Sequence, residues 1–247
     1  MNPCRQLVAF AQNQLDADDV FRALVSYEQW LAPVPVLREH YGRTAFDQVV
    51  MYGHVADFPP GELWLFTDDD AAHRAKVAGS NLGAFAINNT GVDLFENLHA
   101  DWQFIRVNPV SPAELSWTFP RETFAVLQAW VAAIRFEADV RAWASGCPVD
   151  LNALAGYRQF SAFLFANNSV LTLPEQGGLM NPAVVLTAAD CARDLLTRLP
   201  DAVRNDVRQV FTTGEQLLEI LPEQGVDGLL INPFGPGPMF PLRLTAR

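Results

Sequence analysis

The chain contains two copies of the same series of short motifs, and this internal repeat limits what it can fold into. Four motifs occur in the same order in each copy, displaced by 120 to 130 residues. The matching pairs are 24–30 with 154–160, 65–72 with 185–192, 90–98 with 213–221, and apolar runs ending in Asn-Pro at 108–109 and 232–233. A repeat of this length indicates a structural unit that occurs twice, so we interpret the chain as a tandem duplication.

The third motif predicts a short capped helix in each copy. Thr90 and Thr213 are favourable N-cap residues, because their hydroxyl oxygens accept from backbone N–H groups of the first turn. Asp93 and Gln216 stand three residues later, the spacing of a capping box. The apolar run that follows predicts a strand ending at proline, which cannot donate to a ladder.

The second motif predicts a buried strand that leads into a helix. The runs at 63–66 and 183–186 are apolar throughout, and Thr67 or Thr187 follows each. We expect these threonines to cap the helices, whose first turns are acidic and so face the positive end of the helix dipole.

Together these patterns predict an α/β (α+β) protein with two related units, each a small mixed sheet with flanking helices. The first unit spans 1–120 and the second 149–247, with closing strands expected at 114–119 and 239–244. Pro120 opens a long helical stretch within 121–148, whose apolar stripe is wider than packing on one sheet requires. We expect this helix to connect the units, lying between them or at a dimer contact.

Charge and composition exclude several classes of function. The formal net charge of -11 opposes nucleic-acid binding, which requires Lys and Arg to neutralise phosphates. No apolar run approaches the length of a membrane span or a signal peptide, so we expect a cytoplasmic protein without a membrane partner. The three cysteines show no metal-ligand spacing, and we expect neither a metal nor a cofactor.

The Asn-Pro turns hold the polar residues of greatest interest. Asn108 and Asn232 each follow a buried strand, and strand ends in open α/β sheets are common binding positions. The simpler interpretation, which we favour, is that each amide satisfies backbone groups of its own turn.

Other candidates carry weaker signals. His40 and His54 lie in a stretch of the first copy without a counterpart in the second, and Trp30 and Trp102 are aromatic residues that we expect to be exposed. A cation site at 68–70 is disfavoured, because adjacent carboxylates diverge at a helix start. Cys191 has no recognisable base beside it, so we assign no catalytic residue.

Two segments resemble the SseB family, whose members carry an apolar strand into a Phe-Thr turn and later a short helix followed by a Gly-Leu-x-x-Asn-Pro strand. The matching segments are Leu-Phe-Thr-Asp at 65–68 and Val-Asp-Gly-Leu-Leu-Ile-Asn-Pro at 226–233. The resemblance implies small α/β modules in a bacterial accessory protein without a catalytic motif. The first copy departs from the second by a longer stretch at 31–60.

Two functional hypotheses remain. The first is a non-enzymatic protein-interaction or regulatory module whose partner is another protein, with a homodimer as a further option. The alternative is a small-ligand binder or enzyme with its site in the first unit, around the 31–60 insertion. A deep pocket where a histidine meets a carboxylate favours the second hypothesis, and a shallow apolar surface favours the first.

Overall fold

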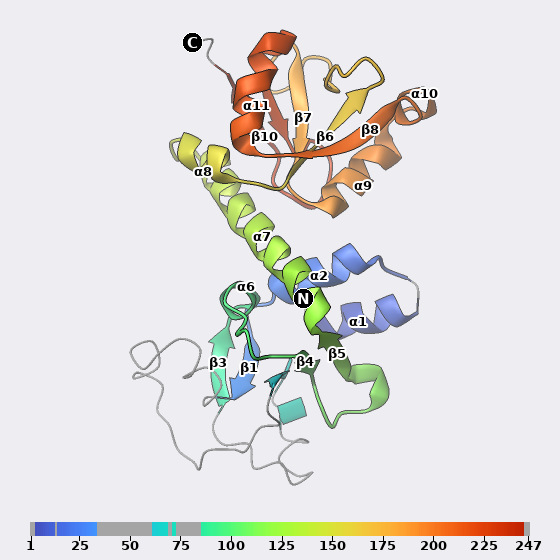
Figure 1. Ribbon diagram of the computed structural model, residues 1–247, viewed down its shortest axis with the longest axis vertical. Helices are drawn as coiled ribbons and strands as arrows, with labels where there is room; N and C mark the ends of the chain where they lie inside the picture. The colour runs from blue at the N-terminus through green and yellow to red at the C-terminus, as the bar shows by residue number, and fades with distance from the viewer. Residues whose placement is uncertain (1–2, 13, 34–60, 69–70, 73–84, 245–247) are drawn as a thin grey trace. The chain divides into compact units, whose positions relative to one another are not determined.

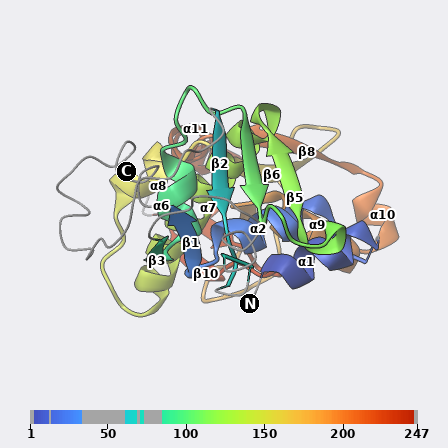
Figure 2. The same ribbon diagram turned by 90° about the horizontal axis from the view of Figure 1, so that it is seen from below.

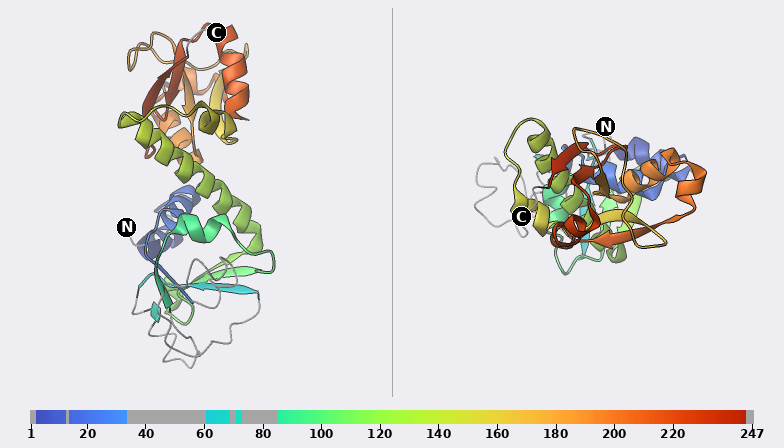
Figure 3. Two further views of the ribbon diagram at one scale, coloured as in Figure 1. Left: turned by 90° about the vertical axis from the view of Figure 1, so that its left-hand side faces the viewer. Right: turned by 90° about the horizontal axis from the view of Figure 1, so that it is seen from above.

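A computed structural model describes residues 3–12, 14–33, 61–68, 71–72 and 85–244 of the chain. Helices and mixed sheets alternate along it, which confirms the predicted α/β class (Figure 1). The chain divides into two compact units, Met1–Val131 and Ala132–Arg247. The helix predicted within 121–148 is α7 (Phe124–Ala144), a continuous helix in which the division between the units falls (Figure 3).

The second unit is built on one five-stranded sheet. Its strands are β6 (Phe160–Phe165), β7 (Pro182–Leu186), β8 (Val207–Thr212), β9 (Gly228–Ile231) and β10 (Phe240–Arg243). They lie in the order β10-β9-β7-β6-β8, with β7 and β9 parallel and the other neighbours antiparallel. The helices are α8 (Leu151–Gly156), α9 (Ala189–Arg198), α10 (Asp201–Arg204) and α11 (Gly214–Ile220), with the 3-10 helix η3 (Leu221–Gln224).

Helices cover both faces of this sheet, which explains why its central strands are almost wholly apolar. On one face the C-terminal half of α7 packs with α8 and α11 over side chains such as Phe160, Val185 and Ile231. On the other face α9 packs over Phe163 and Val184. The core of the unit therefore has a layer on each side of β6, β7 and β9.

The first unit contains the same kinds of element. Among its described residues lie the helices α1 (Pro3–Ala11), α2 (Ala17–Val25) and α6 (Gly91–Glu96). The described strands are β1 (Trp30–Pro33), β2 (Glu62–Leu65), β3 (Phe85–Asn89), β4 (Phe104–Val107) and β5 (Trp117–Pro120). Short 3-10 helices, η1 (Ala113–Leu115) and η2 (Arg121–Thr123), flank β5. Figure 2 shows β2, β4 and β5 beside one another.

The strand order of the first unit matches that of the second. The parallel pair β2-β4 is extended on one side by antiparallel β5, and β1 pairs with β3. Reciprocal hydrogen bonds of 2.8 and 2.9 Å between Leu31 and Phe66 join β1 to the end of β2. The resulting order β5-β4-β2-β1-β3 corresponds strand by strand to β10-β9-β7-β6-β8.

The capped helices form where the third motif predicts them. The N-cap hydroxyls of Thr90 and Thr213 accept from the backbone N–H groups of Asp93 and Gln216 at 3.1 and 3.2 Å. The Gln216 side chain also accepts from the N–H of Thr213, which completes a capping box. The shorter Asp93 side chain instead accepts from the Thr90 hydroxyl.

Two local predictions are wrong. The last strand of the first unit begins at Trp117, because residues Ala113–Leu115 form a 3-10 helix where strand was expected. Thr187 does not cap the helix after β7, since the N-cap position falls on Ala188 and the Thr187 hydroxyl bonds to Glu137 and Asn232 instead.

None of the described helices has the length and apolar character needed to cross a bilayer.

Candidate functional site

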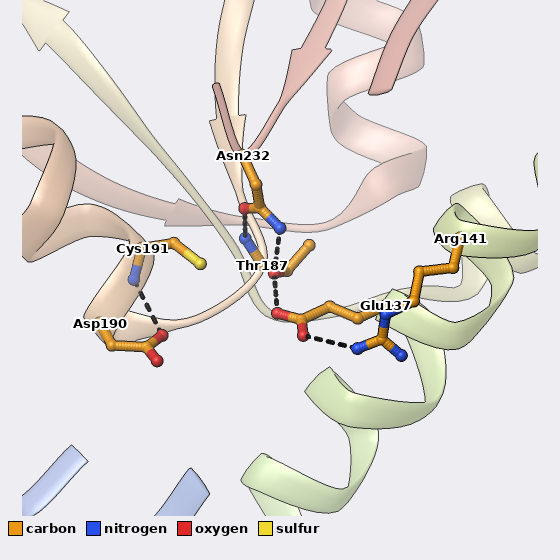
Figure 4. A network of polar contacts seen from close by, with 6 residues as sticks. All are labelled: Glu137, Arg141, Thr187, Asp190, Cys191 and Asn232. Carbon is orange, nitrogen blue, oxygen red and sulfur yellow. Dashed lines mark hydrogen bonds and ion pairs between the residues drawn. The ribbon is translucent and has the colours of Figure 1, made fainter. Parts of the chain in front are cut away.

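The carboxyl ends of the two parallel strands in each unit meet at a threonine and an asparagine. In the second unit Thr187 follows β7 and Asn232 follows β9. The amide oxygen of Asn232 accepts from the Thr187 backbone N–H at 3.0 Å, and its amide nitrogen donates to the Thr187 hydroxyl at 2.8 Å. We call this pair the second clamp (Figure 4).

The first unit holds the same arrangement, which we call the first clamp. The amide of Asn108 accepts from the Thr67 N–H and donates to the Thr67 hydroxyl, both at 3.0 Å. The two asparagines have φ angles of 48° and 46°, in the left-handed region that Asn tolerates better than most residues. Both are only 1% exposed, so each amide closes the gap between two strand ends inside the protein.

A tyrosine at the matching position of each unit hydrogen-bonds to the threonine of the clamp. The hydroxyl of Tyr27 donates to the Thr67 carbonyl at 2.7 Å, and the hydroxyl of Tyr157 donates to the carbonyl of Thr187. The carbonyls of these tyrosines in turn accept from the N–H of Gly91 and Gly214, each at 2.7 Å.

Only glycine fits at those two helix starts. A Cβ added to Gly91 would lie 2.4 Å from the carbonyl oxygen of Leu24, and one added to Gly214 would lie 1.7 Å from that of Leu154. The motifs that reveal the repeat are therefore the residues that join helix, strand ends and turn in each unit.

The clamps differ in the acceptor for the threonine hydroxyl. In the first clamp Thr67 donates to its neighbour Asp68 at 3.0 Å. In the second clamp Thr187 donates at 2.7 Å to Glu137, a fully buried carboxylate of α7 (Figure 4). The exposed Arg141 lies one helical turn later, with its guanidinium 3.7 Å from the same carboxylate.

The Gly-Pro-Gly-Pro loop after Asn232 packs directly on the second clamp. A Cβ at Gly237 would lie 2.4 Å from the amide nitrogen of Asn232 and 3.0 Å from a carboxylate oxygen of Glu137. A Cβ at Gly235 would come within 3.2 Å of the Cα of Cys191. The loop is therefore a tightly fitted cover over the clamp.

These contacts support the structural interpretation of both asparagines, because their amide groups are buried and hydrogen-bonded. Asp190 and Cys191 are also fully buried, and the Asp190 carboxylate accepts from the N–H of Cys191 at 2.8 Å. Among the residues that the structure describes, no three or more His, Cys, Asp or Glu side chains gather as a metal site would require.

The remaining sequence candidates are scattered. Trp30 is fully buried instead of exposed, because its ring packs edge-on against Tyr27 and Phe95 and its N–H donates to the Leu24 carbonyl at 3.1 Å. Trp102 is partly buried, with its ring 6.1 Å from that of His99. His40 and His54, and with them the 31–60 insertion beyond Pro33, lie outside the described residues.

The sequence did not single out the outer edge of β8, the strand at one end of the five-stranded sheet of the second unit. We call this five-stranded sheet the second sheet. β8 pairs with β6 over six residues, and within the described part of the chain no strand pairs with its other side. On β6, the carbonyl of Phe163 accepts from the N–H of Leu171, and the N–H of Phe165 donates to the carbonyl of Ser169. These two groups of β6 therefore point away from β8. Because hydrogen-bonded pairs alternate in an antiparallel ladder, the backbone groups of Gln209 and Phe211 face outward.

This edge carries one large apolar side chain that is strongly exposed. Phe211 is 78% exposed, the largest exposed fraction among the large apolar residues described. Arg208 is the strand's one ionisable residue, and its guanidinium donates to the side-chain oxygen of Asn168 at 2.8 Å. Proteins commonly protect sheet edges with proline, bulges or charge. β8 has a regular register, no proline and a single charged residue, Arg208.

The opposite edge of the same sheet is protected. β10 contains Pro241, and a Cβ added to Gly177 would lie only 2.5 Å from that ring, so the 176–179 turn packs over the strand. The guanidinium of Arg243 donates to the Gly178 carbonyl at 2.6 Å. Within the residues that the structure describes, the second sheet therefore has one covered edge and one open edge.

No protein-family model, curated protein or solved structure matches this chain.

Proposed function

We propose that this chain is a non-enzymatic, SseB-like accessory protein that works as a protein-interaction module. Its working surface is the outer edge of β8, which adds an extended segment of another polypeptide to the second sheet. The observation that carries the proposal is the open edge itself, with Phe211 78% exposed beside outward-facing backbone groups. Strand addition uses such groups for affinity and neighbouring side chains for specificity.

The contrast within the sheet supports this proposal. An unprotected edge risks aggregation, and the β10 edge of the same sheet carries both proline and a covering turn. Because the same sheet protects its β10 edge, the unprotected β8 edge is consistent with a role in binding another chain. The exposed apolar side chain of Phe211 is of the type that anchors protein interfaces.

The clamps support the non-enzymatic part of the proposal. Asn108 and Asn232 place their polar groups at the strand ends where α/β proteins often bind ligands, but each amide is buried against a threonine. These asparagines therefore stabilise the fold, and their amide groups are not exposed for contact with a substrate.

We also infer that the two units arose by duplication and that the protein acts in the cytoplasm. Support for duplication comes from the matching strand order and from the same Tyr, Thr, Gly and Asn contacts in both units. The cytoplasmic assignment rests on the three cysteines without framework spacing.

Affinity purification from the native host tests the interaction. Tagged wild-type chain is compared with Gln209→Pro, which removes an outward N–H while leaving the inner ladder in place. The control is Leu151→Glu, a change at a 57% exposed apolar residue of α8 in the same unit. Proteins recovered with wild type and the control but lost with Gln209→Pro support the proposal, and an unchanged set of proteins overturns it.

A further inference from the structure

We propose that the strand added to β8 is β8 of a second copy of this chain, in an antiparallel arrangement whose two-fold axis passes through Gln209. This inference rests on the proposed function and names the partner. It joins two five-stranded sheets into one continuous sheet of ten strands.

Backbone geometry limits the possible registers. The outward-facing residues of β8 are the alternate ones, Val207, Gln209 and Phe211, and only these can form hydrogen-bonded pairs across the new contact. Two copies related by a two-fold axis must therefore pair these residues with one another. With the axis at Gln209, residue 209 exchanges both of its backbone hydrogen bonds with its own equivalent.

Side chains favour this register. Phe211 of each copy lies opposite Val207 of the other, and an aromatic residue beside a β-branched one is a stabilising cross-strand pair. Arg208 lies opposite Val210, and the two Gln209 amides face each other. No like charges are opposed at any pair.

The neighbouring registers are poorer. Moving the axis to Arg208 places two guanidinium groups directly opposite each other, which is destabilising. Moving it to Val210 places the exposed Phe211 opposite the polar Gln209. Of the registers centred on Arg208, Gln209 and Val210, the one centred on Gln209 gives Phe211 an apolar partner.

The local charge of β8 does not oppose a second copy at this particular place. The chain carries a formal net charge of -11, so two copies repel each other over most of the surface. β8 itself has no acidic residue and one arginine, so it is a segment where two copies meet without local repulsion.

Analytical ultracentrifugation of the full chain tests the proposal with a charge swap at the two-fold axis. The measurement covers roughly 1 to 300 μM, since a short strand contact belongs to the weaker class of interface. Wild type is expected to dimerise. Gln209→Glu and Gln209→Lys each oppose like charges and are expected to weaken dimerisation about fivefold.

An equimolar mixture of the two variants places opposite charges at the axis and is expected to restore dimerisation as a heterodimer. Gln209 is exposed, so these substitutions leave the core unchanged, and circular dichroism verifies that both variants fold. Leu151→Glu, at an exposed site away from β8, is expected to dimerise as wild type does.

The opposing results are distinct. A wild-type chain that stays monomeric throughout the range, or single variants that dimerise as well as wild type, overturns pairing between copies. If the native-host proteins are still lost with Gln209→Pro in that case, strand addition at β8 stands with a different partner. If they are retained, the proposed function fails as well.

Discussion

The second clamp and the outer edge of β8 lie in the same unit, and they treat backbone polar groups in opposite ways. At the clamp, Asn232 satisfies the N–H and hydroxyl of Thr187 inside the protein. At the edge, the outward groups of Gln209 and Phe211 have no strand beside them in the described chain. The difference teaches that the residues at matching positions of both units maintain the fold, while the strand that we propose as the partner surface carries no recognisable motif.

This comparison gives opposite expectations for mutations in the two regions. Changes at the clamp lower stability, and changes at the edge lower binding and leave stability almost intact.

Gly214→Ala is the most damaging change expected near the clamp. The new Cβ would lie 1.7 Å from the Leu154 carbonyl oxygen, so α8 and α11 must separate. We expect a loss of about 3 kcal/mol in the free energy of unfolding of the second unit, measured by urea denaturation. Gly156→Ala, where nothing lies within 4 Å of the added Cβ, is the matched control and is expected to be nearly neutral. Equal effects of the two substitutions would contradict the packing argument.

Asn232→Ala tests the clamp directly. It leaves the buried N–H of Thr187 without its acceptor and places alanine at a φ of 46°. We expect destabilisation of about 2 to 3 kcal/mol, again by urea denaturation. Asn108→Ala is the equivalent change in the first unit and should cost a similar amount there. A cost below about 1 kcal/mol in both units would show that the clamps are dispensable.

Glu137 distinguishes the second clamp from the first. Glu137→Ala removes the acceptor for the Thr187 hydroxyl at 2.7 Å and is expected to cost about 2 kcal/mol. Glu137→Gln retains an acceptor oxygen of the same reach and should recover more than half of that loss. A double-mutant cycle with Thr187→Val measures the coupling, and a coupling near zero would argue against the hydrogen bond.

Phe211→Glu should have the opposite profile. Since the ring is 78% exposed, the free energy of unfolding is expected to change by about 0.5 kcal/mol or less. Dimerisation and capture of partners should nevertheless be lost, because the new carboxylate takes the place of the apolar anchor. The matched change Leu151→Glu should affect neither property. Loss of stability without loss of association would place Phe211 with the clamp and not with the edge.

Asp227 provides a test by pH that involves neither region. A hydrogen bond from the Met180 backbone N–H lowers the pKa of Asp227, assisted by the N–H of Asn181 and the charge of Arg243. A carboxyl whose pKa is lower in the folded state contributes stability above its unfolded pKa and loses it as the pH falls through the folded pKa. In acid, the stability gap between wild type and Asp227→Asn should therefore narrow below about pH 4. A gap that is constant with pH would contradict this assignment.

The sequence predicts the fold class and most strands because each motif specifies local structure. The capped helices at Thr90 and Thr213 follow from residues three positions apart, which needs no knowledge of the tertiary fold. The end of β9 at Ile231, just before Asn232 and Pro233, follows from proline in the same way.

The rest depends on contacts between distant parts of the chain. Thr187 was expected to cap a helix, but its hydroxyl binds Glu137, fifty residues earlier in the sequence. Trp30 was expected to be exposed, but Phe95, far along the sequence, packs edge-on against its ring. Neither partner follows from local spacing.

The open edge had a weak signal in the sequence. β6 is almost wholly apolar, as a central strand is, whereas β8 interrupts its apolar residues with Arg208 and Gln209, as an edge strand does. That pattern can indicate an edge. Whether another element covers the edge is visible only in the structure.

Residue-resolved amide hydrogen exchange, measured over a series of protein concentrations, tests the central claim most directly. If β8 adds a second copy, protection of the Gln209 and Phe211 amides rises with concentration, while protection of the inward-facing Val210 amide stays constant. Exchange at Gln209 and Phe211 that is independent of concentration, while the chain associates, would contradict the claim that this edge is the contact.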